Sequence, residues 1–287
     1  MDIRQRIQEG NIVLEEVIAA KNPRLLRVMP RWLLAYLKRI IHVDEMNAVI
    51  AKLRGVEGVD FAERVLEEFG VEYSVEGLEN VPRDGRYIFA SNHPLGGMDG
   101  MVLITIFGRY FEKIYFPVND ILTLLPQFSS IFLPINKHGA QSQEGAARLN
   151  AAYASDAQML YFPAGLCSRK RGGKIADLEW KSNFVSKAIE YKRDVVPLFF
   201  EGRNTNFFYN LSRIRIALGI KSNIEMLYLV DEMYKQRGAK LRVHVGEPLA
   251  WQELHGHGKS RREVASWIRK RAYSLHLPVK QRSQCMS

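Results

Sequence analysis

A histidine and an aspartate stand six positions apart in the segment ASNHPLGGMDG, residues 90–100. His93 follows an apolar run typical of a buried strand, and Asp99 lies at the start of the helical pattern MVLITIFGRYF. Gly96 and Gly97 lie between them and permit backbone angles that other residues avoid. If the loop folds back, Asp99 can accept the proton on one ring nitrogen of His93, which leaves the other nitrogen as a base for a hydroxyl. The alternative is a histidine that only ends a strand and an aspartate that only caps a helix.

A cluster of cations follows a second predicted strand, in the segment YFPAGLCSRKRGGK, residues 161–174. The chain turns at Pro163 and Gly165. The cations come next, namely Arg169, Lys170, Arg171 and Lys174. A strand end followed by clustered cations can bind a phosphate or a carboxylate. The alternative is a solvated basic loop.

Other reactive residues give weaker signals. Cys167 could form a covalent acyl intermediate, although a cysteine beside such a turn more often packs in the core. The two histidines of HGHG, residues 255–258, lack the further ligands that a metal site needs. A serine hydrolase would need a nucleophile elbow, and no G-x-S-x-G occurs in the chain.

Short apolar and β-branched runs alternate with helical patterns after Gly70. The runs cover residues 86–91, 113–118, 159–162, 194–200, 225–230 and 241–246. The alternation predicts an α/β domain over residues 71–287, with a mixed, mostly parallel sheet flanked by helices. Residues 1–70 have the apolar spacing of helices, including an uninterrupted pattern over residues 3–20. Pro197, inside the fourth run, requires an edge position or a strand end.

The composition indicates a basic globular protein. The 287 residues are 47% hydrophobic and carry a net charge of +10, which predicts an anionic partner such as nucleic acid, a membrane surface or an acidic carrier protein. Basic residues are scattered among acidic ones without a recognised nucleic-acid module, so nucleic acid is not expected. Two cysteines, no apolar secretory signal and no apolar run of about 18 residues predict a cytoplasmic protein without a membrane span.

Taken in order, four stretches resemble the boxes of the glycerolipid (lysophospholipid) acyltransferase superfamily. These are Asn92-His93 with Asp99, FLPINK ending at Lys137, FPAGLCSR beginning at Phe162, and Val196-Pro197. The resemblance covers residues 71–246 and implies the glycerolipid acyltransferase fold. It implies that His93 and Asp99 are catalytic. It also implies a set of substrate-binding residues, namely Asn92, Lys137, Phe162, Pro163, Gly165, Ser168, Arg169 and Lys170.

Three departures from the family pattern concern the substrate. Five residues, rather than four, separate His93 from Asp99. Lys137 replaces the arginine of the second box and loses its bidentate fork, and Ala164 replaces a glutamate that in the family helps to hold the glycerol phosphate acceptor. The boxes NHPLGG and FPAG are similar to those of a hemolysin-like bacterial branch linked to acylation of lyso-aminolipids such as ornithine or glycine lipids.

The resemblance therefore implies an O-acyltransferase that moves a fatty acyl group from acyl carrier protein or coenzyme A to a hydroxyl of a lysolipid, either an aminolipid or a lysophospholipid. His93, oriented by Asp99, would deprotonate that hydroxyl, and a cationic site would stabilise the oxyanion. No metal or tightly bound cofactor is required. The alternative is a non-catalytic lipid-binding relative.

A lipid substrate also implies peripheral contact with an anionic membrane surface, on the cytoplasmic face of the inner membrane. Residues 31–42 place Trp32, Tyr36 and several leucines beside cations, as interfacial helices do. The alternative is that this apolar stripe packs on the α/β domain.

Overall fold

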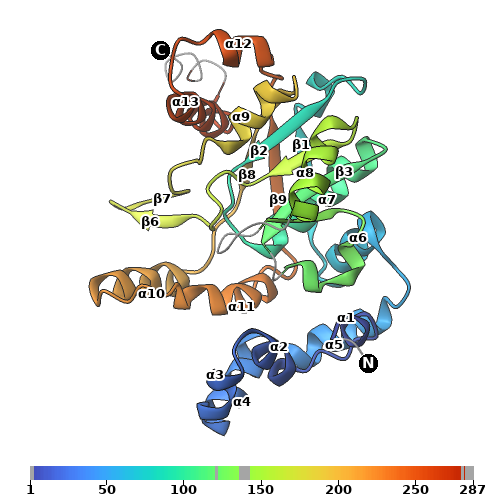
Figure 1. Ribbon diagram of the computed structural model, residues 1–287. Coiled ribbons are helices and arrows are strands. Elements are labelled where there is room, and N and C mark those ends of the chain that lie inside the picture. Colours follow the sequence, from blue (N-terminus) through green and yellow to red (C-terminus); the bar gives the residue numbers. More distant parts are fainter. Residues whose placement is uncertain (1–2, 120–121, 136–142, 279–280, 282–287) are drawn as a thin grey trace.

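A seven-stranded sheet with helices on both faces forms the body of the protein (Figure 1). The computed structural model describes residues 3–119, 122–135, 143–278 and 281. The strands of the sheet are β1 (Glu72–Glu76), β2 (Tyr87–Ser91), β3 (Ile114–Asn119), β4 (Phe132–Ile135), β5 (Gln158–Tyr161), β8 (Asp194–Glu201) and β9 (Lys240–Val245). They lie in the order β1-β9-β8-β2-β5-β3-β4, and only the β8–β9 pair is antiparallel. The prediction of a mixed, mostly parallel sheet is confirmed.

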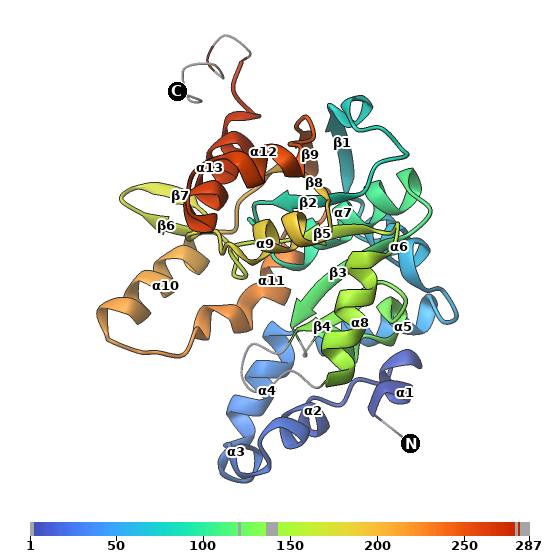
Figure 2. The ribbon, with the colours of Figure 1, turned by 45° about the horizontal axis from the view of Figure 1, so that its top comes forward.

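Two helical layers cover the sheet. One face packs on α6 (Gly58–Glu68) and α7 (Gly97–Tyr110). The other packs on α8 (Gln143–Ala154), α9 (Asn183–Glu190), α12 (Trp251–Gly256) and α13 (Arg261–Ser274), which face the viewer in Figure 2. Central strand β2 alternates between the layers, because Tyr87 and Phe89 enter the first core and Ile88 and Ala90 the second. With both faces covered, the strand is apolar throughout, which explains its continuous apolar run.

The N-terminal section is helical, as predicted. Its first helices are α1 (Ile3–Gln8), α2 (Leu14–Lys21), α3 (Pro23–Val28), α4 (Arg31–Ile40) and α5 (Val43–Lys52). The uninterrupted helix predicted over residues 3–20 is wrong, since α1 ends before Gly10, whose φ of +74° lies in the left-handed region. A Cβ on Gly10 would also lie 2.6 Å from the Asn47 carbonyl oxygen of α5. The division of the chain at residue 70 stays a prediction, and α6 packs on the sheet beside α7.

The strand predicted over residues 225–230 is wrong. These residues form η4 (Ile224–Tyr228) and the start of α11 (Leu229–Tyr234), which follow α10 (Asn206–Ala217). A short apolar run does not distinguish a strand from a buried helical turn. In the helical turn, the buried carboxylate of Glu225 lies 3.0 Å from a guanidinium nitrogen of Arg169.

A two-stranded hairpin was not predicted from the sequence. It consists of β6 (Arg169–Arg171) and β7 (Lys174–Ala176), which are antiparallel. Gly172 and Gly173, both with positive φ, form the two-residue turn. A Gly-Gly pair between short runs is a recognised hairpin signal, so RGGK could have predicted this element.

Pro197 lies inside an interior strand, so the predicted edge or terminal position is wrong. The paired residues of β8 and β9 end at Leu198 and Val245, and beyond them the amide of Gly246 donates to the Pro197 carbonyl. The next contact along this ladder is the bridge between Val195 and Leu249. The missing N–H of the proline therefore coincides with an interruption of the ladder.

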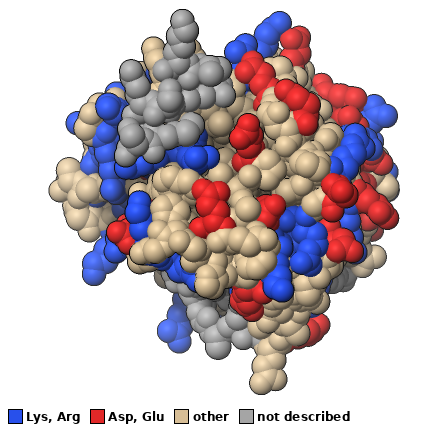
Figure 3. Space-filling view, turned by 90° about the horizontal axis from the view of Figure 1, so that it is seen from above, with Lys and Arg blue, Asp and Glu red and all other residues tan. Residues whose placement is uncertain are grey.

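The surface carries both signs of charge on the face above α12 and α13, where Lys and Arg side chains alternate with Asp and Glu (Figure 3). Within the described part of the chain, no helix is long and apolar enough to cross a bilayer.

Candidate active site

His93 and Asp99 meet just beyond the carboxyl end of β2. The Nδ1 atom of His93 lies 3.0 Å from Oδ2 and 3.2 Å from Oδ1 of Asp99. The Asp99 carboxylate is fully buried, whereas the imidazole remains 17% exposed. The ring therefore turns one nitrogen toward the carboxylate and stays partly exposed.

Gly96 allows the loop to fold back. Its φ is +85°, and a Cβ at this position would lie 3.2 Å from Leu229 of α11 and 3.4 Å from the Cys167 sulfur. The positive backbone angle favours glycine, and a larger residue would also have to displace the Leu229 side chain slightly. This turn accommodates the five-residue spacing between His93 and Asp99.

The Asp99 carboxylate is held on both oxygens. Oδ2 accepts from the amide of Leu95 at 3.0 Å, and Oδ1 accepts from the amide of Gly100 at 2.9 Å. Burial of His93 opposes protonation of its ring, but the facing Asp99 carboxylate and, to a lesser degree, the Cys167 thiol outweigh burial and raise the pKa of His93 well above its usual range. The pair can therefore hold a proton on the imidazole, as a general base must after it has accepted one.

The FPAG segment packs against the histidine loop. The ring of Phe162 stacks on His93 with centroids 3.9 Å apart, and the amide of Ser168 donates to the His93 carbonyl at 2.8 Å. Pro163 and Gly165 form the turn between them, in which the Gly165 amide donates to the Phe162 carbonyl.

A second buried carboxylate, Asp177, was missed. Its Oδ1 accepts from the His93 amide at 3.1 Å and from the Ser168 hydroxyl at 2.6 Å, while Oδ2 accepts from the Trp180 indole at 2.9 Å. Burial raises the pKa of Asp177, and these hydrogen bonds oppose the rise. Asp177 joins the histidine loop to the FPAG segment. The role of Asp177 could not be predicted locally, because the surrounding segment KIADLEW contains no recognised motif.

Asn92 fixes the end of β2 to β8. Its side-chain amide donates to the Phe200 carbonyl at 2.9 Å and accepts from the Phe200 amide at 2.6 Å. Both hydrogen bonds are buried, and through them the side chain of Asn92 holds the end of β2 against β8.

Arg169 differs most from its predicted place. It is 5% exposed and its guanidinium donates to the Glu225 carboxylate at 3.0 Å and to the Cys167 carbonyl at 2.7 Å. Glu225 also pairs with Arg215 at 2.8 Å. A cation with these buried partners supports the loop and does not present a free charge to an acceptor.

The remaining predicted residues are placed differently. Lys170 lies on β6 and is partly exposed, while Lys137 lies outside the described residues. Ala164 is buried in the core beneath α9 and α13. In the parts of the chain that the structure describes, no group of three or more His, Cys, Asp or Glu side chains is placed to hold a metal ion.

Comparison with known proteins identifies the family. A family model described as acyltransferase matches residues 16–280. The chain belongs to this acyltransferase family. The superfamily resemblance seen in the four boxes is therefore confirmed.

Two relatives of this acyltransferase are named lyso-glycine lipid O-acyltransferase. The protein of Bacteroides thetaiotaomicron is 43% identical over 265 residues, which cover 92% of this chain and 97% of the relative. That of Phocaeicola vulgatus is 46% identical over 242 residues, 84% of this chain and 87% of the relative. The prediction of an O-acyltransferase enzyme is confirmed, in preference to a non-catalytic relative.

Among solved structures, the 1-acyl-sn-glycerophosphate (LPA) acyltransferase of Thermotoga maritima matches with 16% identity and a TM-score of 0.42. The match covers 85% of this chain and 96% of that one.

Proposed function

We propose that this acyltransferase moves a fatty acyl group from a thioester of acyl carrier protein or coenzyme A to the hydroxyl of a lyso-aminolipid of the glycine lipid class, at the cytoplasmic face of the inner membrane. The observation that carries the proposal is the contact of His93 with the buried Asp99 carboxylate at the end of β2. The two relatives named lyso-glycine lipid O-acyltransferase support the choice of acceptor.

His93 is the base in this proposal. Asp99 holds Nδ1, so Nε2 takes the proton of the acceptor hydroxyl, whose oxygen attacks the thioester carbonyl. The tetrahedral intermediate collapses with cleavage of the carbon–sulfur bond, and the proton passes from His93 to the leaving thiolate. Lys170 and Lys137 are the cations proposed to hold the acceptor's anionic group, because Arg169 is bound to Glu225. No metal or cofactor takes part in these steps.

The test is acyl transfer by the purified protein to lyso-glycine lipid, with acyl carrier protein and coenzyme A thioesters compared as donors. His93→Ala should lower kcat/KM by at least about 100-fold, because a positioned general base contributes a factor of about 10² to 10⁴. His257→Ala, at a histidine that contacts Trp267 far along the chain, is the matched control and should keep wild-type activity. Equal activity of both variants would overturn the role of His93.

Lipid profiling of cells with and without the gene product tests the acceptor. The diacylated glycine lipid should disappear and its monoacyl precursor accumulate. An unchanged glycine lipid profile together with a missing phospholipid would reassign the acceptor to a lysophospholipid.

A further inference from the structure

Two segments of the chain carry positive charge without any acidic residue. Residues 17–43 and residues 202–224 contain no Asp or Glu and together contain ten Lys and Arg. Together they carry a charge of +10, equal in size to the net charge of the chain, while the rest of the chain contains 31 cations and 31 acidic residues. We call them the N-terminal arm and the α10 arm.

The same arms carry most of the exposed large apolar side chains. Twelve such side chains are exposed in the described part of the chain, and nine of them belong to the arms. In the α10 arm they are Phe207, Ile214, Ile216, Leu218 and Ile220, and in the N-terminal arm Leu25, Val28, Trp32 and Tyr36. Leu218 is 69% exposed and Trp32 is 72% exposed. Exposed apolar clusters beside cations mark an interaction surface.

The α10 helix is held firmly from its inner side. Phe208, Tyr209 and Ser212 are buried, and the Ser212 hydroxyl donates to the same Glu225 carboxylate that pairs with Arg215. The inner side of α10 is well packed, so the exposure of Ile214 and Leu218 does not result from a loosely attached helix.

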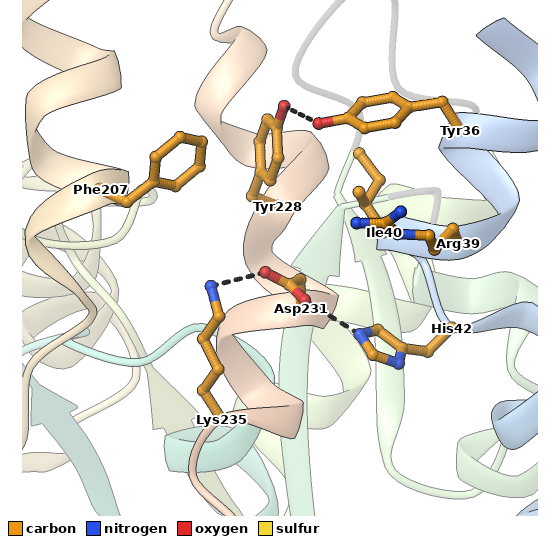
Figure 4. Close-up of a pocket in the computed structure, with 8 residues that line it drawn as sticks. All are labelled: Tyr36, Arg39, Ile40, His42, Phe207, Tyr228, Asp231 and Lys235. Atoms are coloured by element: carbon orange, nitrogen blue, oxygen red, sulfur yellow. Dashed lines mark hydrogen bonds and ion pairs between the residues drawn. The ribbon is translucent and has the colours of Figure 1, made fainter.

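The two arms adjoin at one end of the molecule. Helices α3, α4 and α10 lie at the end opposite α12 (Figure 1). The hydroxyls of Tyr36 and Tyr228 are 2.6 Å apart, which joins α4 to η4. A cavity of about 290 Å³ opens between the arms, with Tyr36 and Arg39 on one side and Phe207 on the other (Figure 4).

Helix α11 lies between the cavity and the loop that carries His93. Asp231 and Lys235 of the α11 region line it, while Leu229 and Met233 of α11 face Gly96 and Gly97 of the histidine loop. A surface that receives both arms would therefore lie close to the loop that carries His93.

We propose that the two arms dock together on the surface of an anionic phospholipid bilayer, with the α10 arm as a second membrane-contacting element beside the N-terminal helices. A bilayer surface satisfies both features of the arms, since apolar side chains enter the acyl boundary while Lys and Arg reach the anionic headgroups. An acidic carrier protein would satisfy the cations but leave exposed Trp and Ile side chains in water. The proposal rests on a lipid acceptor as the substrate.

Vesicle binding tests the α10 arm. The full-length protein is mixed with phosphatidylcholine vesicles with and without phosphatidylglycerol, and bound protein is measured by co-sedimentation. Ile214→Ser with Leu218→Ser should weaken binding at least about tenfold, because two exposed aliphatic side chains that would enter the bilayer are lost. Arg213→Glu with Lys221→Glu should weaken binding to the anionic vesicles by a similar factor.

Matched controls come from exposed positions outside the arms. Tyr73→Ser with Leu122→Ser removes two other exposed large apolar groups, and Lys259→Glu with Lys270→Glu makes the same change in net charge. Both controls should bind as the wild type does. Wild-type binding by the α10 variants, or equal weakening by the controls, would overturn the proposal. So would a loss of acyl carrier protein binding with vesicle binding unchanged.

Activity separates this inference from the proposed function. The α10 variants should lose acyl transfer to lysolipid in vesicles and retain it with lysolipid dispersed in detergent. If the wild type binds vesicles through the arms but transfers no acyl group to any lysolipid, the proposed function fails and the docking surface stands. If His93 is required for transfer but the α10 variants act equally on both forms of lysolipid, the docking surface fails alone.

Discussion

The histidine loop and the two arms differ in whether their side chains and backbone groups find partners within the chain. In the loop, both Asp99 oxygens, the His93 amide and the His93 carbonyl all have partners within the chain. In the arms, nine large apolar side chains are exposed, and the cations exceed the acidic residues by ten within the segments themselves. The fold thus completes the geometry of the proposed catalytic pair internally, whereas the arms leave large apolar side chains exposed.

The largest expected effect is on the cluster that connects these two regions. Glu225 pairs with Arg169 beneath the FPAG segment and with Arg215 of α10. Glu225→Ala leaves two guanidinium groups without their buried counter-ion, so the free energy of unfolding should fall by about 3–5 kcal/mol, measured by urea denaturation.

An exposed ion pair provides the control. Glu179 and Arg262 are 56% and 75% exposed, so Glu179→Ala should cost at most about 1 kcal/mol. If Glu225→Ala were as mild as Glu179→Ala, the histidine loop and the α10 arm would not share a common support.

A second prediction concerns the pH dependence of the histidine loop. The base must be neutral to accept a proton, so kcat/KM should rise with pH through the raised pKa of His93. Asp99→Asn removes the carboxylate that raises this pKa. The acid limb of the pH profile should therefore move to lower pH, while the plateau falls by about 100-fold or more because the ring loses its orienting partner. An unmoved acid limb would assign the titration to another group.

Stability should respond to pH in the opposite direction from activity. Because the folded-state pKa of His93 is raised, the protonated pair stabilises the fold fully below the unfolded value of about 6.5. That contribution is lost as the pH rises through the folded-state value. Asp99→Asn should abolish this dependence in unfolding measured on either side of the window, whereas vesicle binding by the arms should be unaffected.

The sequence predicted the site where its residues are close along the chain. His93, Gly96 and Asp99 lie within seven positions, so a strand end, a turn and a helix start were enough to predict their contact. Asp177 is 84 positions from His93 and Glu225 is 56 positions from Arg169. The buried role of Arg169 depends on that distant glutamate, and for this reason a local pattern of cations predicted a free charge.

The fold was predictable to a similar extent. Buried strands such as β2 are apolar throughout because both of their faces are covered, whereas β1, with Glu72 and Glu76 at its ends, is mostly exposed and gave no apolar run. Charge concentration in residues 17–43 and 202–224 was visible in the sequence. Its meaning was not, because only the fold brings the two segments to the same end of the molecule.

The smallest expected effect is at the hydrogen bond that joins Tyr36 of the N-terminal arm to Tyr228 of η4, next to the α10 arm. Burial and the hydrogen bond with Tyr36 raise the pKa of Tyr228 to about 12, so the Tyr228 hydroxyl stays protonated at neutral pH and can take part in the hydrogen bond with Tyr36. Tyr36→Phe and Tyr228→Phe should each lower the free energy of unfolding by at most about 1 kcal/mol, and a double-mutant cycle should give a coupling of about 0.5–1 kcal/mol. If the effects of the two substitutions on the free energy of unfolding are strictly additive, this hydrogen bond does not stabilise the contact of α4 with η4.

The same variants distinguish attachment of the arms from docking. Tyr→Phe keeps the aromatic ring and every charge, so vesicle binding should stay within about twofold of the wild type, since the lost hydroxyl contributes little to apolar burial. Tyr73→Phe, at an exposed tyrosine of β1, is the control for a hydroxyl lost from the surface. A large loss of vesicle binding by Tyr36→Phe without a change in stability would mean that the Tyr36 hydroxyl itself contacts the bilayer, and that the joint belongs to the docking surface rather than to its support.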